Sequence, residues 1–397
     1  MISNRLRLKR SMLPLIVLLV SVVALTPSVG YATTNTSALS AQWVKYSGNP
    51  VLSPTSGSWD ANYVMSPRVL NVSSGYDMWY DGGSAGIAAI GFANSTDGIN
   101  WTKDPQPVLS PGPQDAWDSG QVALGSVIWN GTLFLMWYGG SNTTTNSNGA
   151  VGFATSKDGI SWDKYSGNPV LQRSLFSPDQ SYMATPYVIK LQLYYYMWYT
   201  GRNTTYPQPN PTARILAATS YDGITWTKMP TPTMTPSTNP QAWDSGAVYS
   251  PSANFANTNF GLWYTGTNQS YMMPQIGFAN SLDGEKWTQL SDQPILGLGA
   301  PGSWDSAGVE QPSVIMTGNG LMMYYDGFSN TTAARIGLAF GSQNFEILAF
   351  PPPSFDTAIG PYAPATADSF TFYQLDRSSS LRLENRDFAT RNSTNEG

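Results

Sequence analysis

A set of short sequence blocks recurs in a fixed order along this chain, and this repetition constrains the fold more than any other feature. One block is a turn of the form Ser-x-Asp-Gly-x-x-Trp, whose copies end at tryptophans 61, 64 and 61 residues apart. The copies occupy residues 95–101, 156–162, 220–226 and 281–287. Asp and Gly suit a tight hairpin, because Asp bonds its own turn and Gly accepts positive φ. The turns are therefore interpreted as structural.

Three further blocks keep the same spacing. An apolar segment of the type Ile-Gly-Phe-Ala precedes each turn and has a fifth copy without one, at 90–93, 151–154, 215–218, 276–279 and 336–339. A Met-Trp-Tyr-like segment lies at 78–80, 136–138, 197–199, 262–264 and 323–325. A Trp-Asp pair, Pro-Asp in the third copy, lies at 59–60, 117–118, 178–179, 243–244 and 304–305.

Each copy therefore contains four short strands separated by turns, the pattern of a propeller blade. The strands carry β-branched and aromatic residues on both faces, as expected for sheets buried between neighbouring sheets. Five copies predict an all-β, five-bladed β-propeller over residues 41–350, built from four-stranded antiparallel blades.

The ends of the repeat region predict how the ring closes. The fifth copy lacks its fourth strand, whereas residues 43–52 form an unpaired one near the start of the chain. Residues 45–52 and 164–171 share the sequence Lys-Tyr-Ser-Gly-Asn-Pro-Val-Leu. We expect the N-terminal strand to complete blade 5, which removes the exposed sheet edges that favour aggregation.

The segments outside the repeats are of different character. Residues 1–32 combine a basic start, an apolar run at 12–25 and small residues before position 33, which is the pattern of a cleaved signal peptide. An uncleaved membrane anchor is the alternative, although the run is shorter than the roughly 20 residues of a spanning helix. We expect a mature protein that is secreted or held at the cell surface, not in the membrane. Residues 351–397 are predicted to be a partly disordered tail.

Composition limits the chemistry. The chain contains no Cys and no His, so disulfides, thiolate nucleophiles and Ser-His-Asp triads are excluded. Acid–base work is left to carboxylates, Tyr or Lys. The net charge of −5 argues against a nucleic-acid partner, and we expect a monomer. Sequons that predict glycosylation in a suitable host occur at Asn71, Asn94, Asn100, Asn130, Asn142, Asn203, Asn268 and Asn330.

In these motifs the chain resembles the five-bladed propeller glycoside hydrolases, a superfamily that includes arabinanase, β-xylosidase, invertase and mannoside phosphorylase-like enzymes. The resemblance implies a carbohydrate ligand and two carboxylates at the channel end of the inner strands: a general acid in a Glu-x-Pro setting and a base in an Asp-Pro dipeptide. Glu310-Gln311-Pro312 matches the first pattern. The second is unmatched, because the corresponding positions read Ser66-Pro67, Leu124-Gly125, Thr185-Pro186, Ser250-Pro251 and Gln311-Pro312.

The aspartates of the Trp-Asp pairs have two interpretations. Asp60, Asp118, Asp179, Asp244 and Asp305 lie in the connectors that enter the inner strands. They could form an acidic ring at the channel mouth, which would bind a hard cation such as Ca²⁺ or supply a displaced catalytic base. Alternatively, each caps a turn or accepts a local hydrogen bond.

Residues that break the five-fold pattern are the other candidates. Glu310 and Arg68 are each unique to one blade, and they form either a buried ion pair or a catalytic acid and a sugar clamp. Asp81 and Asp326 replace Gly or Thr of other blades. The substrate-binding candidates are Arg68, Tyr63, Tyr187, Tyr249, Gln311 and Asp326.

These features predict an exported carbohydrate-acting protein, glycosidase-like, that hydrolyses or binds a glycan at an axial pocket. Glu310 is the expected acid, and the base is drawn from Asp60, Asp118 or Asp81. The alternative is a non-catalytic glycan-binding or cell-surface interaction module on a degenerate glycosidase scaffold. No cofactor is expected, with Ca²⁺ left open.

Overall fold

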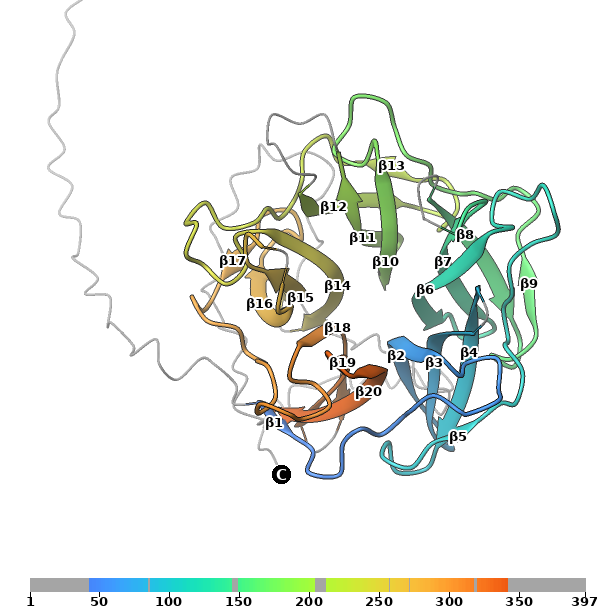
Figure 1. Ribbon diagram of the computed structural model, residues 1–397. Helices are drawn as coiled ribbons and strands as arrows, with labels where there is room; N and C mark the ends of the chain where they lie inside the picture. The colour runs from blue at the N-terminus through green and yellow to red at the C-terminus, as the bar shows by residue number, and fades with distance from the viewer. Residues whose placement is uncertain are drawn as a thin grey trace, which may run out of the picture. The chain divides into compact units, whose positions relative to one another are not determined.

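A computed structural model describes residues 43–341 apart from positions 85, 145–148, 204–211, 257, 271 and 318–319. The expected signal peptide and C-terminal tail lie outside the described residues. Within the described part, all regular structure is β, in five antiparallel four-stranded sheets. Figure 1 shows these sheets arranged as blades around a central channel, with the first strand of each blade nearest the centre.

The blades follow one another along the chain. Blade 1 contains β2 (Tyr63–Val72), β3 (Gly75–Ser84), β4 (Ile87–Ser95) and β5 (Thr102–Lys103). Blade 2 contains β6 (Gln121–Trp129), β7 (Phe134–Ser141), β8 (Ala150–Ser156) and β9 (Trp162–Lys164). Blade 3 contains β10 (Tyr182–Leu191), β11 (Tyr194–Arg202), β12 (Ala213–Ser220) and β13 (Thr227–Lys228). Blade 4 contains β14 (Ala247–Ala256), β15 (Asn259–Thr267), β16 (Gln275–Ser281) and β17 (Thr288–Gln289). Blade 5 contains β18 (Gly308–Thr317), β19 (Gly320–Ser329), β20 (Thr332–Gly341) and β1 (Trp43–Lys45).

The N-terminal strand closes the ring as predicted. β1 pairs with β20 in antiparallel register, with Val44 opposite Phe340. The side-chain amide of Asn49 then bonds both backbone groups of Leu338, at 2.8 Å each. Asn168 makes the same pair of bonds to Phe153 in blade 2. The repeated Asn-Pro-Val-Leu connector therefore has the same function in both blades.

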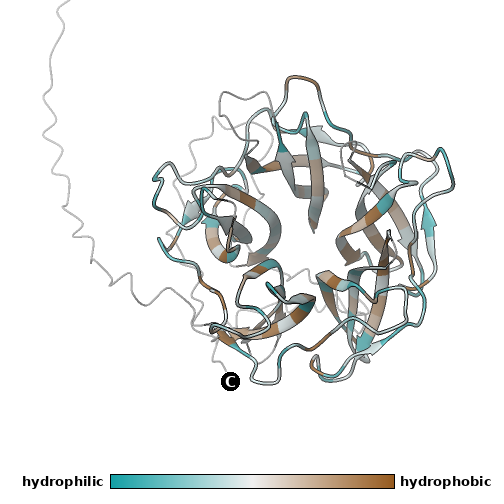
Figure 2. Ribbon diagram, in the orientation of Figure 1, coloured by the Kyte–Doolittle hydropathy of each residue, from teal (hydrophilic) through white to brown (hydrophobic). Residues whose placement is uncertain are grey.

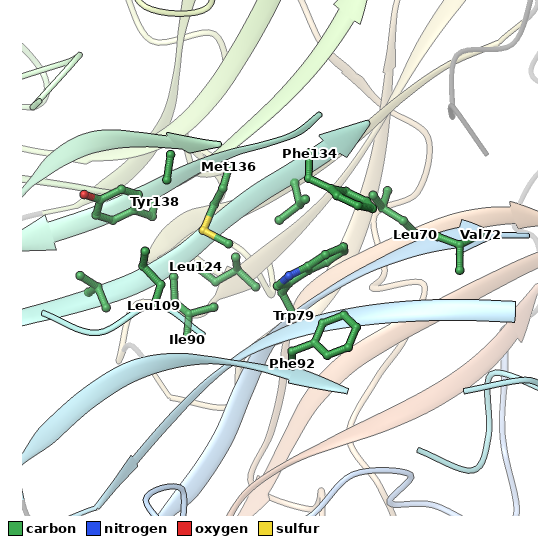
Figure 3. Packing of buried hydrophobic residues seen from close by; sticks show 13 residues of the cluster. Leu70, Val72, Trp79, Ile90, Phe92, Leu109, Leu124, Phe134, Met136 and Tyr138 are labelled. Atoms are coloured by element: carbon green, nitrogen blue, oxygen red, sulfur yellow. The ribbon is translucent and has the colours of Figure 1, made fainter. Parts of the chain in front are cut away.

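Apolar side chains hold neighbouring blades together. Figure 3 shows the cluster between blades 1 and 2, where Trp79 lies among Ile90 and Phe92 of its own blade and Leu124 and Phe134 of the next. Figure 2 shows the same division on a larger scale, with hydrophobic residues along the strands and hydrophilic ones in the outer connectors. Burial of this apolar surface between sheets is the dominant stabilising contribution.

Two of the repeated blocks meet at each blade interface. The indole N–H of Trp79 donates to the carbonyl of Gly159 at 2.8 Å, and Trp137 and Trp198 make the same bond to Gly223 and Gly284. These glycines belong to the Asp-Gly turns and have positive φ. The turns are thus structural, and each one anchors the Met-Trp-Tyr strand of the preceding blade.

The Trp of the Trp-Asp pair and the Gly of the Ile-Gly-Phe-Ala segment recur together from blade to blade for a steric reason. Trp59 stacks on Tyr80 with ring centroids 5.9 Å apart, and a Cβ at Gly91 would lie 2.5 Å from the Tyr80 ring and 2.7 Å from Trp59. Blade 3 has Pro178 in place of this Trp, and there the glycine position is Leu216. The Leu216 side chain is buried, which fits a blade without the indole.

Among the residues described here, no helix has the length and apolar character that a membrane crossing requires.

Candidate functional site

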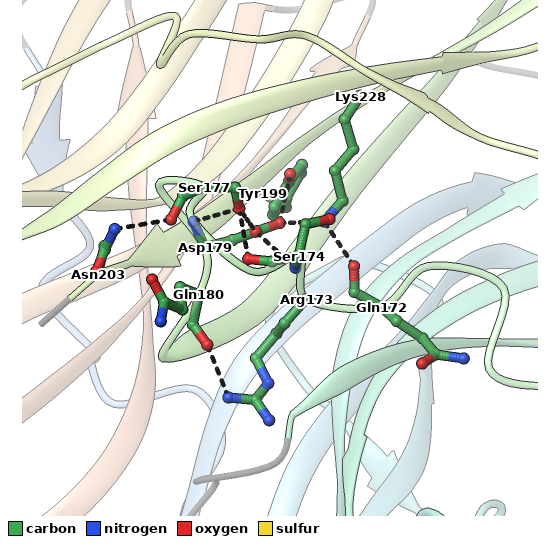
Figure 4. A network of polar contacts seen from close by, with 9 residues as sticks. All are labelled: Gln172, Arg173, Ser174, Ser177, Asp179, Gln180, Tyr199, Asn203 and Lys228. Carbon is green, nitrogen blue, oxygen red and sulfur yellow. Dashed lines mark hydrogen bonds and ion pairs between the residues drawn. The ribbon is translucent and has the colours of Figure 1, made fainter. Parts of the chain in front are cut away.

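The aspartates of the Trp-Asp pairs each lie in a polar network within their own blade. Asp118 is buried, accepts a bond from the Tyr138 hydroxyl at 3.1 Å and pairs with Lys164 at 2.6 Å. Figure 4 shows the equivalent network in blade 3, where Asp179 receives donors from Tyr199, Ser177 and Lys228. Asp60 pairs with Lys103 and Asp305 with Lys45 in the same manner.

These networks favour the structural interpretation of the five aspartates over an acidic ring. In the part of the chain that the structure describes, no three acidic side chains come together in a way that could hold a metal ion. Asp60 and Asp118 were predicted as candidate bases. Each carboxylate, however, accepts hydrogen bonds from a Tyr hydroxyl and a Lys ammonium of its own blade. We therefore assign them to the scaffold. Of the three predicted bases, Asp81 remains as a candidate.

The inner strand of each blade is also irregular near its N-terminal end. In all five blades the register with the second strand shifts there, which marks a β-bulge. In four blades the residue before Pro has positive φ, at Ser66, Thr185, Ser250 and Gln311. The bulge turns the backbone N–H of this residue away from its own sheet.

Side chains of the preceding blade accept these N–H groups. Asp81 accepts from Leu124 at 2.6 Å, and Asp326 accepts from Ser66 at 2.9 Å with both carboxylate oxygens. The hydroxyls of Thr200 and Thr265 accept from Ser250 at 3.0 Å and Gln311 at 2.9 Å. These bonds, each from a bulge N–H to a second-strand side chain of the preceding blade, form an inter-blade ring of hydrogen bonds. Asp81 and Asp326, the two aspartates that break the repeat, occupy acceptor positions in this ring.

Glu310 lies one residue before the bulge of blade 5 and is partly accessible to solvent. Its carboxylate accepts a hydrogen bond from the Tyr249 hydroxyl of blade 4 at 2.8 Å. Burial raises the pKa of Glu310, and the bonds from Tyr249 and Gln311 only partly offset this rise. The group therefore tends to keep its proton at higher pH than an exposed Glu.

Asp326 lies close to Glu310, and Asp81 is within electrostatic range of Asp326. Asp326 is opposite Glu310 in the β18–β19 register, so the two side chains emerge on the same face of the sheet. Burial raises the pKa of Asp326 well above its ordinary value, and the charges of Glu310 and Asp81 raise it further. Burial also raises the pKa of Asp81, to about 7, against the opposing effects of the Leu124 N–H, Ser66 and Arg68.

Tyrosines from three blades border this carboxylate cluster, which comprises Glu310, Asp81 and Asp326. Burial raises the pKa of Tyr249 and of Tyr182, and the charge of Glu310 adds to both shifts. Burial and the charge of Asp81 raise the pKa of Tyr63 to about 12. All three hydroxyls stay protonated at neutral pH, and that of Tyr249 acts as a hydrogen-bond donor to Glu310.

Arg68 lies beyond the bulge, deeper along the inner strand of blade 1, and is buried. Its guanidinium donates to the carbonyls of Gly125 at 2.5 Å and Pro67 at 2.7 Å, and it lies 5.4 Å from the centre of the Tyr187 ring. Among the described ion pairs none joins Arg68 to Glu310. Arg68 and Tyr187 thus fill the channel interior, which differs from both the predicted sugar clamp and the predicted ion pair.

Gln311 links the cluster to blade 1. Its side-chain oxygen accepts a hydrogen bond from the Ser66 hydroxyl, and its amide contacts Glu310. This predicted substrate-binding residue therefore orients the carboxylate of Glu310 in the free protein.

Two cavities lie away from the carboxylate cluster. One, of about 670 Å³, is in blade 4 and is lined by Asp244, Gln289 and Gln241 among other polar residues. The other, of about 360 Å³, lies between the segments 46–51 and 99–102.

One predicted glycan acceptor is also placed differently from expectation: Asn203 is buried, and its amide donates to the carbonyl of Ser177 at 2.9 Å.

Two groups of residues in these networks were not predicted from the sequence. One is the lysines that neutralise the buried aspartates, Lys45, Lys103, Lys164 and Lys228, which all lie two positions after a Trp. This repeated Trp-x-Lys spacing could have identified these lysines from the sequence. The other is the acceptors Thr200 and Thr265, which no sequence pattern connects to a bulge in the next blade.

Comparisons with known proteins agree with this architecture. No family model matches the chain. An uncharacterised protein of Mycobacterium tuberculosis (strain CDC 1551 / Oshkosh) is 29% identical over 232 residues, which are 57% of this chain and 74% of that protein. A 1,2-β-oligomannan phosphorylase of Thermoanaerobacter sp. (strain X514) is 25% identical over 244 residues, or 58% of this chain and 73% of the phosphorylase.

Solved structures show the same fold. A glycoside hydrolase matches with a TM-score of 0.61 at 18% identity, over 79% of this chain and 96% of that chain. A structure from the GH130 family of mannoside phosphorylases, which contains glycoside hydrolases that target β-1,2-mannosidic linkages in Candida mannan, matches with a TM-score of 0.58 at 17% identity, over 75% and 93% of the two chains. The predicted resemblance is thus confirmed: in fold, this chain is a five-bladed propeller like those of the glycoside hydrolases and mannoside phosphorylases.

Proposed function

We propose that the protein cleaves a glycan at the mouth of the propeller channel and that Glu310 is the proton donor. The observation that carries this proposal is the setting of Glu310, which combines a raised pKa, partial exposure and a hydrogen bond from Tyr249. No other blade has a carboxylate at this position. The corresponding residues are Met65, Ala123, Ala184 and Tyr249.

The chemistry requires a proton at the oxygen that leaves the sugar. A carboxyl group with a raised pKa keeps this proton to a higher pH than an exposed carboxyl group and releases it as the glycosidic bond breaks. The Glu310 carboxylate that results can then recover a proton from water. The Tyr249 hydroxyl, already bonded to Glu310, stabilises the negative charge that forms on this carboxylate.

A second carboxylate must deprotonate a nucleophile or attack the sugar carbon. Asp81 is the best candidate, since its pKa of about 7 suits a base that works near neutral pH. Asp326 is less suited, because both of its oxygens accept the N–H of Ser66 and the side chain is fully buried. We assign Asp326 to the scaffold, as the acceptor of the Ser66 N–H.

The comparisons support the substrate class. One matched relative is a phosphorylase of β-1,2-linked oligomannan, and one matched structure belongs to a family with hydrolases of β-1,2-mannosidic linkages. We propose a neutral β-linked glycan and take β-1,2-mannobiose as the first probe. Tyr63, Tyr182 and Tyr249 would offer aromatic faces to the C–H surfaces of such a sugar.

A non-catalytic glycan-binding module is the second candidate. It is favoured by the inner strands, none of which carries Asp before its Pro, and by the use of Asp81 as a structural acceptor for Leu124. In that case the mouth would bind the sugar without turnover.

The test compares wild type, Glu310→Gln and the exposed control Glu285→Gln on aryl glycosides and β-1,2-mannobiose, with and without inorganic phosphate. We expect Glu310→Gln to lower kcat at least 100-fold, within the usual contribution of a general acid. Sugar affinity should stay within about threefold, because Gln keeps the shape and the acceptor for Tyr249. Wild-type binding without turnover would select the module, and neither binding nor turnover would refute both candidates.

We also propose that the protein is exported and cleaved after position 32. The basic and apolar pattern of residues 1–32 supports this proposal. N-terminal sequencing of the protein recovered outside the cell tests it, and an intact Met1 would argue for a retained anchor.

A further inference from the structure

The inter-blade ring of hydrogen bonds is incomplete at one place. Four bulge N–H groups have a side-chain acceptor on the preceding blade, at Asp81, Thr200, Thr265 and Asp326. The fifth acceptor position, on blade 2, is Gly139, which lies opposite Ala123 in the β6–β7 register. The bulge residue that should donate to it is Thr185 of blade 3.

Gly139 is not required by crowding or by backbone conformation. A Cβ at this position would meet only the carbonyl and the Cβ of Ala123, at 3.7 and 3.9 Å, which are ordinary contacts. At the adjacent Gly140 a Cβ would lie 2.6 Å from the Trp117 ring. Gly139 also lacks the positive φ that marks many other glycines of the chain. An acceptor side chain would therefore fit, and its absence leaves an open notch.

The donor that faces this notch lacks the acceptor that its counterparts have. Thr185 has no partner in the β10–β11 register, and its N–H makes no hydrogen bond to a side chain of the described residues. Its hydroxyl is already bonded to that of Thr200 at 2.6 Å. Ala123 and Thr185 are both partly exposed, so the notch is open rather than sealed in the core.

The position of the notch relates it to the proposed catalytic acid. Glu310 lies on blade 5, and its register position before the bulge corresponds to Ala123 on blade 2. Blades 2 and 3 are not neighbours of blade 5 in the ring, so the notch faces Glu310 from across the channel mouth (Figure 1). A glycan that spans the mouth would contact both.

We propose that the notch formed by Ala123, Gly139 and Thr185 is a sugar subsite, in which the Thr185 N–H donates a hydrogen bond to a hydroxyl oxygen of the bound glycan. This inference rests on the proposed function of the channel mouth. A neutral hydroxyl fits better than a carboxylate group, because Asp81, with a pKa of about 7, is partly ionised at neutral pH and would repel an anionic ligand at the same mouth. The missing side chain thus makes room for the ligand, and the ligand supplies the missing acceptor.

Substitutions that fill the notch separate this proposal from a purely structural account. Gly139→Thr introduces the residue found at the equivalent positions 200 and 265. Its hydroxyl should accept the Thr185 N–H, slow the hydrogen exchange of that amide at least tenfold and raise Tm by about 2–4 °C. The affinity for β-1,2-mannobiose should fall at least tenfold, since the subsite is closed. Gly139→Ala should weaken binding without slowing the exchange.

Thr265→Gly is the reciprocal control, because it removes an acceptor from a completed position. Exchange of the Gln311 amide should accelerate and Tm should fall. The notch proposal is wrong if Gly139→Thr slows Thr185 exchange and yet binds the sugar as well as wild type. It is also wrong if Gly139→Thr lowers Tm and leaves Thr185 exchange fast. If wild type itself binds neither β-1,2-mannobiose nor another neutral oligosaccharide of the screen, the proposed function fails first and the subsite falls with it.

Discussion

Asp244 differs from its four repeat counterparts in the residue that neutralises it. In the other blades a Lys pairs with the buried aspartate, whereas Asp244 receives the amide of Gln289 at 2.6 Å. The Tyr264 hydroxyl is retained at 3.1 Å. The buried aspartate thus keeps its bond from the Tyr hydroxyl in every blade, although its second partner is Lys in four blades and Gln in one. We therefore regard this aspartate as part of the scaffold. The same reasoning supports the proposal that Glu310 is functional, because none of its four counterparts carries a carboxylate.

The raised pKa of Asp81 predicts an unusual pH dependence of stability. The folded state holds a proton that the unfolded chain releases near pH 4, so the stabilising effect is complete below about pH 4 and is lost as pH rises to about 7. The shift corresponds to about 4 kcal/mol. Asp81→Asn keeps an acceptor for Leu124 and removes the titration. We expect its free energy of unfolding to vary less between pH 4 and 7 than that of wild type.

Urea unfolding at several pH values measures this difference. Asp97→Asn is the control, because the turn hydrogen bonds to Asn100 and Ile99 lower the pKa of Asp97 and place its effect below pH 4. Glu310 and Asp326 also have raised pKa values, so some slope should remain in Asp81→Asn. Parallel curves for wild type and Asp81→Asn would show that Asp81 is ionised throughout this range.

Candidate site residues could be picked out from the sequence only where the repeat was broken. Glu310 stood out because four other blades offer a direct comparison. For Asp60 and Asp118 two interpretations stayed open, since a buried carboxylate and a catalytic one look alike until the partner is known, and their Tyr and Lys partners favour the structural one. Lys103 and Lys164 follow their aspartates by 43 and 46 residues, a separation that only the blade geometry closes.

At the scale of the strand, the repeated blocks form one steric unit. Trp304 stacks on Tyr325 at 5.9 Å, and a Cβ at Gly337 would lie 2.7 Å from the Tyr325 ring. The same relation holds wherever the Trp is present, and blade 3 changes both positions together, to Pro178 and Leu216. The sequence predicted these strands correctly, because turn chemistry and apolar runs are local properties. The β-bulges could not be predicted, because they depend on acceptors in the neighbouring blade.

Two matched glycine substitutions test this steric unit. Gly91→Ala places a Cβ 2.5 Å from the Tyr80 ring, and such overpacking should lower the free energy of unfolding by about 1–3 kcal/mol. Gly139→Ala on the second strand of blade 2 meets no close atom and should leave stability unchanged or slightly higher. Denaturant titration of both variants provides the measurement. Equal losses would mean that the Trp–Tyr stack does not set the glycine position.

At the scale of the molecule, the ring depends on a strand that comes from the far end of the sequence. Lys45 of β1 pairs with Asp305, 260 residues away, and completes the Asp–Tyr–Lys network of blade 5. This closure was predictable, because the N-terminal segment repeats the sequence of a blade-2 strand. Closure leaves no blade without its fourth strand in the described residues.

A cross-link tests the closure directly, because the chain has no Cys of its own. Val44 and Phe340 are opposite each other in the register and both are exposed. Paired strand positions have a Cα separation that suits a disulfide. Val44→Cys with Phe340→Cys should oxidise to an intramolecular disulfide, visible as a mobility shift on a non-reducing gel. Val44→Cys with Leu282→Cys is the control, and an equal yield there would contradict the pairing.

The molecule combines a five-fold symmetric scaffold with an asymmetric channel mouth, which we propose to be the glycan site. The crystal structure of Glu310→Gln with the oligosaccharide that binds most tightly tests this division most directly. We predict the sugar at the mouth, in contact with Tyr249 and position 310 on one side and with the Thr185 N–H on the other. Sugar bound in the blade-4 cavity beside Asp244, or on the outer turns with the mouth empty, would contradict the account.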